Sequence, residues 1–295
     1  MKKASTYLMS VILTILLIIS MLGTIGLTLM KFRALSAGSC LQLVKTQDLA
    51  ERVHQSLEKY YQEQENVTGI PLSVYADSIS TSECDKLIRL SITNAFGYMN
   101  GTVDEFGIKP DFSELKIDMT AFFEDYAEKN DFEKDETYQK KLNEAQLAAQ
   151  TNIKTECDVF RFQTLQEAGL IDKVKKVVPY VGFGLIACAA ADLVLFLLLL
   201  AVNRKEKQHV WYWLGNSLLV SAILIMIPAI WLNVSRWFDK FAVKTDQIFA
   251  AVTGYLYGLT HAAITAAGVA ILVAVCCYIL FIIQHRMRNA RTNGR

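Results

Sequence analysis

Four long apolar runs dominate the pattern of hydrophobic and polar positions along the chain. They cover residues 4–30, 177–202, 210–235 and 247–284, and the one formally charged side chain within them is Asp192. A helix of about 20 apolar residues crosses a hydrocarbon layer ~30 Å thick, because each residue adds about 1.5 Å. The pattern therefore predicts four transmembrane helices.

The last apolar run is too long for one simple span. Residues 247–261 do not fit into a bilayer together with residues 262–284. Either the first segment lies along the membrane surface, or the fourth helix rises out of the membrane and packs on the domain outside it. Gly254 and Gly258 favour a break in this region.

The first apolar run predicts an uncleaved signal-anchor. Lys2 and Lys3 provide the basic start of a signal peptide. However, the apolar region of a cleaved signal peptide is only about 7–15 residues long. The uncharged run here, residues 4–30, is much longer, so we expect it to remain as a membrane helix.

Apolar residues recur every three or four positions between the first two runs, which is the period of a helix. The stripe appears in residues 41–61, 83–99 and 135–168. We expect the first and last of these helices to form an antiparallel pair, capped by the shorter elements 83–99 and 113–128. The whole block, residues 34–172, is long enough to bury a core of its own.

Together these patterns predict an all-α integral membrane protein with four transmembrane helices and a mainly helical extracytoplasmic domain between the first and the second. The predicted parts are the cytoplasmic N-terminus with transmembrane helix 1 (1–33), the acidic extracytoplasmic domain (34–172), transmembrane helix 2 (173–202), a basic cytoplasmic turn (203–209), transmembrane helix 3 (210–235), an outer amphipathic loop (236–261), transmembrane helix 4 (262–284) and a basic cytoplasmic tail (285–295).

Charge is divided unevenly along the chain, and this determines the predicted orientation. Residues 34–172 hold 25 acidic and 13 basic residues, a net charge of −12, whereas the rest of the chain holds 4 acidic and 17 basic ones, a net charge of +13. Short basic segments stay in the cytoplasm. We therefore expect a plasma (cell) membrane protein with both termini cytoplasmic and residues 34–172 outside. The inverted orientation is the alternative, because Lys31 and Lys173 also flank the membrane on the predicted outer side.

Catalytic and cofactor motifs are absent from the sequence. It contains no HExxH, GxSxG, GxxxxGK[ST], GxGxxG or CxxC pattern, and its four histidines are scattered. The acidic run Glu124–Glu136 lacks the glycine and the terminal glutamate of a calcium loop, so we interpret it as a solvated junction between helices. We expect no enzymatic activity, no cofactor and no metal site.

The six cysteines divide between two environments. Those in the predicted membrane helices are Cys188, Cys276 and Cys277, and those in the outer domain are Cys40, Cys84 and Cys157. Three cysteines in an oxidising compartment allow one internal disulfide with three different pairings. We favour Cys84–Cys157, because Cys40 lies close to the first span. The alternative is that all three remain reduced.

Asp192 is the most informative residue in the membrane, because an ionised carboxylate there costs roughly 2.5–3.5 kcal/mol. Gly184 and Cys188 lie on its helical face and favour close helix packing. We expect Asp192 to face the interface between the second and third helices, either protonated and bonded to Asn216 or a serine, or ionised beside water or a partner's cation. The polar candidates are Asp192, Asn216, Ser217 and Ser221, with a weaker stripe of Ser20, Thr24 and Thr28 on the first helix.

The preferred function is a non-enzymatic membrane protein whose outer domain binds a partner, as a receptor, an adhesion protein or an assembly subunit. The alternative is a transporter, channel or ABC-permease-like subunit that uses the polar residues around Asp192. The order of segments resembles claudin-like tetraspan proteins and lipoprotein-export ABC permeases in topology alone. The expected partners are the lipid bilayer and a protein, not nucleic acid, and the oligomeric state stays open.

Overall fold

The computed structural model describes residues 2–293 and the side chains of residues 6–288. Its elements are α1 (Lys2–Leu29), the π-helical turn η1 (Met30–Ala34), α2 (Ala37–Thr46), α3 (Leu49–Thr68), the 3₁₀ turn η2 (Leu72–Val74), α4 (Thr81–Met99), α5 (Ser113–Lys129), α6 (Glu136–Cys157), α7 (Phe162–Glu167), α8 (Leu170–Val202), α9 (Gln208–Val234), the 3₁₀ turn η3 (Trp237–Lys240) and α10 (Asp246–Asn293). No residue between 2 and 293 lies in a strand, so the all-α prediction is confirmed. The basic residues of the chain ends, Lys2, Lys3, Arg291 and Arg295, lie outside the described side chains.

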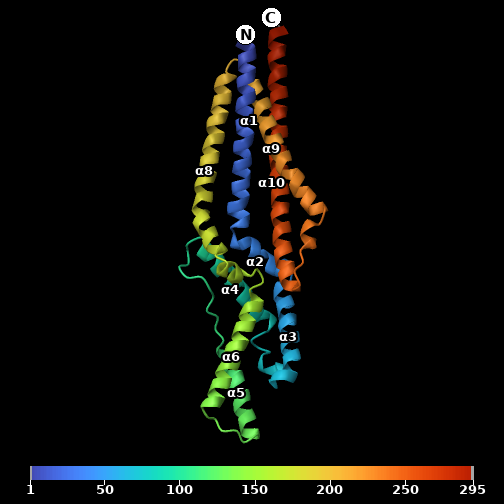
Figure 1. The fold of residues 1–295 in the computed structure, drawn as a ribbon. Coiled ribbons are helices and arrows are strands. Elements are labelled where there is room, and N and C mark those ends of the chain that lie inside the picture. Colours follow the sequence, from blue (N-terminus) through green and yellow to red (C-terminus); the bar gives the residue numbers. More distant parts are fainter. Residues whose placement is uncertain (1, 294–295) are drawn as a thin grey trace. The chain divides into compact units, whose positions relative to one another are not determined.

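Four of the helices are long and apolar enough to cross a membrane, as the sequence predicts. These candidate spans are Thr6–Ala34, Leu170–Val202, Gln208–Val234 and Asp246–Arg288. The chain divides into two compact units (Figure 1). Unit 1 consists of Met1–Ser36, Val177–Lys240 and Leu256–Arg295, and unit 2 of Ala37–Lys176 and Phe241–Tyr255.

Unit 1 is a bundle in which α1 lies between α8 and α9 (Figure 1). At one end, Leu13 and Leu17 of α1, Leu199 of α8 and Val210 of α9 form a small apolar cluster. Farther along α9, Ala222 packs with Ala267 and Ala270 of α10. Small side chains at this contact let two helices approach closely, which is how helices associate in hydrocarbon.

Unit 2 has a single apolar core built from α2, α3, α4, α5 and α6. Its largest fully buried side chains include Leu49, Leu57, Ile88, Leu115, Met119 and Ile153. The α3 and α6 helices pack on each other as predicted, and the hydroxyl of Tyr61 donates to the carbonyl of Ala149 at 3.4 Å. The core thus forms from the helical stripes that the sequence shows.

Two helices of unit 2 are shorter than the sequence predicts. The stripe in residues 41–61 belongs to two helices, because Asp48 adopts a left-handed conformation with φ of 48° between α2 and α3. The helix predicted over residues 135–168 ends at Cys157, and α7 follows as a separate helix. The apolar period continues across both breaks, so it does not reveal them.

The predicted outer loop 236–261 is also shorter, since α10 begins at Asp246. The first turns of α10 belong to unit 2, where Ala251 is fully buried in the core. Gln247 donates to Ser56 at 3.2 Å and to Glu156 at 2.7 Å, and Asp246 forms an ion pair with Arg52. The first part of the segment 247–261, up to Tyr255, thus packs on the domain, as one of the two alternatives expects.

Candidate functional site

Asp192, the candidate polar residue of α8, is hydrogen-bonded to α1. The hydroxyl of Thr24 donates to Oδ2 of Asp192 at 2.7 Å, while Oδ1 of the same carboxyl is buried and has no hydrogen-bond partner. One turn away, Ser20 donates to the carbonyl of Cys188 at 3.2 Å. A Cβ added to Gly23 would lie only 3.0 Å from the sulfur of Cys188, so the absence of a side chain lets α1 and α8 approach.

The prediction that Asp192 bonds to Asn216 or a serine of the third helix is wrong. Asn216 accepts a hydrogen bond from the hydroxyl of Tyr278 on α10 at 2.6 Å. Ser217 and Ser221 donate to backbone carbonyls of α1 and of their own helix. The physical reason is that the small residues of α1 bring its Thr24 hydroxyl within bonding distance of Asp192.

The predicted membrane positions therefore do not form one polar site. Asp192 belongs to the contact between α8 and α1, whereas Asn216 belongs to the contact between α9 and α10. Sequence reasoning noted the polar stripe with Thr24 but assigned Asp192 to another helix, and it missed Tyr278. Gly215 is the signal that could have indicated Tyr278, because a Cβ there would lie 3.1 Å from the tyrosine ring.

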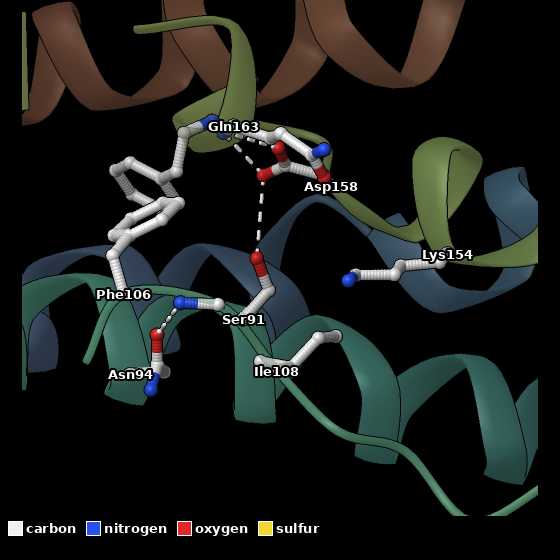
Figure 2. Close-up of a pocket in the computed structure, with 9 residues that line it drawn as sticks. Ser91, Asn94, Phe106, Ile108, Lys154, Asp158 and Gln163 are labelled. Carbon is white, nitrogen blue, oxygen red and sulfur yellow. Dashed lines mark hydrogen bonds between the residues drawn. The ribbon is translucent and has the colours of Figure 1, made fainter. Parts of the chain in front are cut away.

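Unit 2 contains a small hollow between α4, α7 and the segment that follows α4 (Figure 2). Asp158 borders it and accepts hydrogen bonds from Ser91 Oγ at 3.2 Å and from the backbone N–H groups of Phe162 at 3.0 Å and Gln163 at 2.8 Å. On the facing side, Asn94 accepts a hydrogen bond from the backbone N–H of Gly107 at 2.8 Å.

These bonds assign Asp158 a structural role. Its carboxylate satisfies two N–H groups at the start of α7, which no helical carbonyl can reach. The hollow has a volume of about 20 Å³, which is enough for about one water molecule and too small for a substrate. Although Lys154 also borders it, the hollow is not a candidate for an active site.

A more conspicuous surface feature of unit 2 is the junction of α5 and α6. We call residues 124–136, which include Tyr126 and Phe132, together with the neighbouring Phe122, the acidic–aromatic tip. The rings of Tyr126 and Phe132 stack with their centroids 6.1 Å apart. The ring centroid of Phe122 lies 6.2 Å from that of Tyr126. Phe132 is 60% exposed and Tyr126 is 51% exposed.

The backbone at the end of α5 explains how Phe132 is placed. The N–H of Phe132 donates to the carbonyl of Ala127 at 2.9 Å, and the residue directly before Phe132, Asp131, has a positive φ of 50°. This arrangement is a Schellman-type helix end, in which the residue after the left-handed one contacts the last turn. The contact with Tyr126 is thus expected, but it leaves most of the Phe132 ring uncovered.

Charge at the tip is strongly negative. Residues 124–136 contain seven acidic residues and two lysines, a net charge of −5. Both lysines are already paired within the tip, Lys129 with Asp125 at 2.6 Å and Lys134 with Glu128 at 3.2 Å. The tip therefore combines exposed aromatic rings with excess negative charge.

The third feature of unit 2 is a pair of neighbouring thiols. Cys84 in the first turn of α4 and Cys157 at the end of α6 are both fully buried and joined by a thiol–thiol hydrogen bond. That bond, and then burial, raise the pKa of Cys157 well above its ordinary value. The pairing favoured from the sequence thus joins two residues that lie side by side, as free thiols in this structure.

Comparisons of the chain with protein-family models, with curated proteins and with solved structures found no match. Among the residues that the structure describes, no group of three or more His, Cys, Asp or Glu side chains could hold a metal ion. The arguments for function consequently rest on the surfaces and contacts given above.

Proposed function

We propose that this chain is a non-enzymatic, multi-pass cell-membrane protein whose extracytoplasmic helical domain binds a protein partner, as a receptor, an adhesion protein or an assembly subunit. Unit 1 would span the bilayer, and unit 2 would lie outside. The orientation is supported by the basic turn between α8 and α9, where Arg204, Lys205 and Lys207 lie within four residues.

The acidic–aromatic tip is the observation that carries the proposal. Large exposed aromatic side chains in a domain that faces water mark surfaces that a partner covers. Aromatic residues are also enriched among those that contribute most to protein–protein binding. The tip offers Tyr126 and Phe132 in one stacked pair, on a helix junction held by regular backbone hydrogen bonds.

The charge of the tip specifies the chemistry of the partner. A net charge of −5 over residues 124–136 attracts a basic surface and repels an acidic one. The proposed partner is therefore a protein segment that carries lysine or arginine residues around one or two apolar anchors. Nucleic acid is disfavoured, because its phosphates would be repelled by the same carboxylates.

Transport is the second candidate function, and one observation favours it. The buried, unbonded Oδ1 of Asp192 could accept a proton or face a cation in the membrane. The polar contacts of unit 1 are divided among three helix pairs, however, namely α1 with α8, α1 with α9, and α9 with α10. If transport is the function, Asp192→Asn should abolish flux in liposomes while the protein still folds.

Site-specific photocrosslinking in intact cells tests the proposed binding. Phe132→benzoylphenylalanine in the full-length chain places a photoreactive group at the centre of the tip. We expect a discrete crosslinked protein whose attached peptide contains basic and apolar residues. The matched control is Val67→benzoylphenylalanine, because Val67 is 79% exposed in unit 2 but lies on α3. This control should give no such adduct.

The charge requirement is tested in the same cells. Glu124→Gln, Asp131→Asn and Glu133→Gln together remove three exposed carboxylates and change the net charge of the tip from −5 to −2. We expect the adduct at position 132 to decrease by more than tenfold. An unchanged adduct, or equal adducts at positions 132 and 67, would show that the tip is not the binding surface.

The orientation is tested with Glu133→Cys in unit 2 and Lys205→Cys in the basic turn, with the unsubstituted chain as the blank. A membrane-impermeant maleimide added to intact cells should label only the first variant. Labelling of only the second would place unit 2 in the cytoplasm.

A further inference from the structure

Cys84 and Cys157 belong to α4 and α6, which pack together, and a side-chain hydrogen bond joins the two thiols. Cys84 donates its proton to the carbonyl of Ile79 at 3.3 Å, so its sulfur is left to accept the proton of Cys157. Both residues belong to the apolar core of unit 2 and are fully buried. The two thiols are therefore neighbours within the closed core of unit 2.

We propose that Cys84 and Cys157 form a structural disulfide bond in the mature protein. The proposal depends on the location of unit 2 outside the cytoplasm, where disulfides persist, but not on partner binding. Two S–H bonds break and one S–S bond forms. The two electrons and two protons pass to the disulfide of a thiol–disulfide oxidoreductase, which becomes a dithiol after a mixed-disulfide intermediate.

The burial of the two cysteines determines when the bond can form. Exchange needs a thiolate that can reach the oxidant, whereas both thiols are fully buried and Cys157 has a raised pKa. The bond must therefore form before the core of unit 2 closes. For the same reason, the folded and oxidised protein should resist reduction by dithiothreitol until it unfolds.

Cys40 provides an internal comparison within the same unit. It is also buried, in α2, and burial raises its pKa to about 12. The thiol–thiol bond of Cys157 is made with Cys84 and not with Cys40. The structure thus assigns one specific pairing of the three that the sequence allows, and Cys40 should remain a free thiol.

Peptide mapping of the full-length chain tests the pairing. Membranes from producing cells are denatured in iodoacetamide without reductant, digested and analysed by mass spectrometry. We expect one disulfide-linked pair of peptides that contain Cys84 and Cys157, with Cys40 alkylated. Alkylation of both Cys84 and Cys157, or a bridge that includes Cys40, would overturn the proposal.

Thermal unfolding tests whether the bond is structural. Reduction of the unfolded chain before refolding should lower the unfolding midpoint of unit 2 by roughly 5–15 °C. The Cys84→Ser, Cys157→Ser double variant should show no such dependence on reductant, whereas Cys40→Ser should behave like the parent chain. An equal dependence on reductant in the double variant would contradict the proposal.

The maleimide labelling described above separates the two ways in which the mapping could fail. If labelling shows unit 2 in the cytoplasm and both thiols are free, the proposed orientation and the disulfide are both overturned. If labelling shows unit 2 outside and both thiols are free, the disulfide alone is overturned and the proposed function stands.

Discussion

Units 1 and 2 differ in where they place their large apolar and their small side chains. In unit 2 the fully buried residues are large and apolar, as shown by Leu57 and Ile88. In unit 1 one apolar cluster buries Leu17 and Leu199, but the contacts along α9 bury small residues, and Ser217, Ser221 and Ala222 have no exposed surface at all. Other large apolar residues of α8 face outwards, and Tyr180, Phe183 and Ile186 are 68–72% exposed.

This difference is what we expect if unit 1 lies in a bilayer and unit 2 in water, as proposed above. A domain in water folds because burial removes apolar surface from water. Helices surrounded by hydrocarbon gain nothing from such burial, so close packing of small residues and hydrogen bonds between helices hold them together. The same helical chain can therefore build both units, with more of its large apolar residues exposed in unit 1.

Truncation of a core leucine should have the largest effect and should be confined to unit 2. Leu57→Ala removes a fully buried side chain, and we expect it to destabilise unit 2 by about 2–5 kcal/mol. The matched change in unit 1, Leu193→Ala, removes a leucine that is 60% exposed, and its effect should be below about 0.5 kcal/mol. Urea unfolding of the full-length chain in detergent micelles, followed by protease susceptibility, measures both.

Equal losses from Leu57→Ala and Leu193→Ala would contradict the comparison, because they would mean that α8 buries its large side chains as α3 does. Such a result would indicate that another chain covers the exposed face of α8.

The sequence predicts where the helices lie along the chain better than it predicts which helices contact each other. The stripe in residues 83–99 identifies α4 closely, because burial in water imposes the helical period on the sequence, and the expected element 113–128 nearly coincides with α5. The breaks at Asp48 and Asp158 are missed, since they depend on single backbone conformations and on a local capping bond. The partners of Asp192 and Asn216 are missed because chain order does not determine which membrane helices touch.

Overpacking should have the largest effect in unit 1. A Cβ at Gly215 of α9 would lie 3.1 Å from the ring of Tyr278 and 3.4 Å from the carbonyl of Ala274. We expect Gly215→Val to destabilise the bundle by about 1–3 kcal/mol, because the ring must move away from its bond to Asn216. Gly268→Val is the matched control in α10, since a Cβ there meets no atom within 4 Å. Thermal unfolding in detergent should show a lower midpoint for the first variant than for the second.

Helix capping should matter at an intermediate level in unit 2. Asp135 is the N-cap residue of α6 and accepts a hydrogen bond from the backbone N–H of Tyr138 at 2.8 Å, whereas Lys207, the N-cap residue of α9 in unit 1, makes no side-chain capping bond. Asp135→Ala should cost about 1 kcal/mol in urea unfolding of unit 2. Glu133→Ala removes the same charge from the same loop and should cost much less. If the two losses are equal, the effect of Asp135→Ala is one of charge and not of capping.

The smallest effect is expected for the hydrogen bond between α1 and α8. Thr24→Val removes the donor to Asp192 but keeps the shape of the side chain. Measured hydrogen bonds between membrane helices average only about 0.6 kcal/mol, so we expect a loss of that size in detergent unfolding. Thr28→Val is the control on the same helix, because the Thr28 hydroxyl is exposed and donates only to the carbonyl of Thr24 within α1.

Asp192→Asn keeps an acceptor for Thr24 and should therefore change stability little. A double-mutant cycle of Thr24→Val with Asp192→Leu isolates the pair, and a coupling energy near zero would show that side-chain packing alone, without this bond, holds α8 against α1.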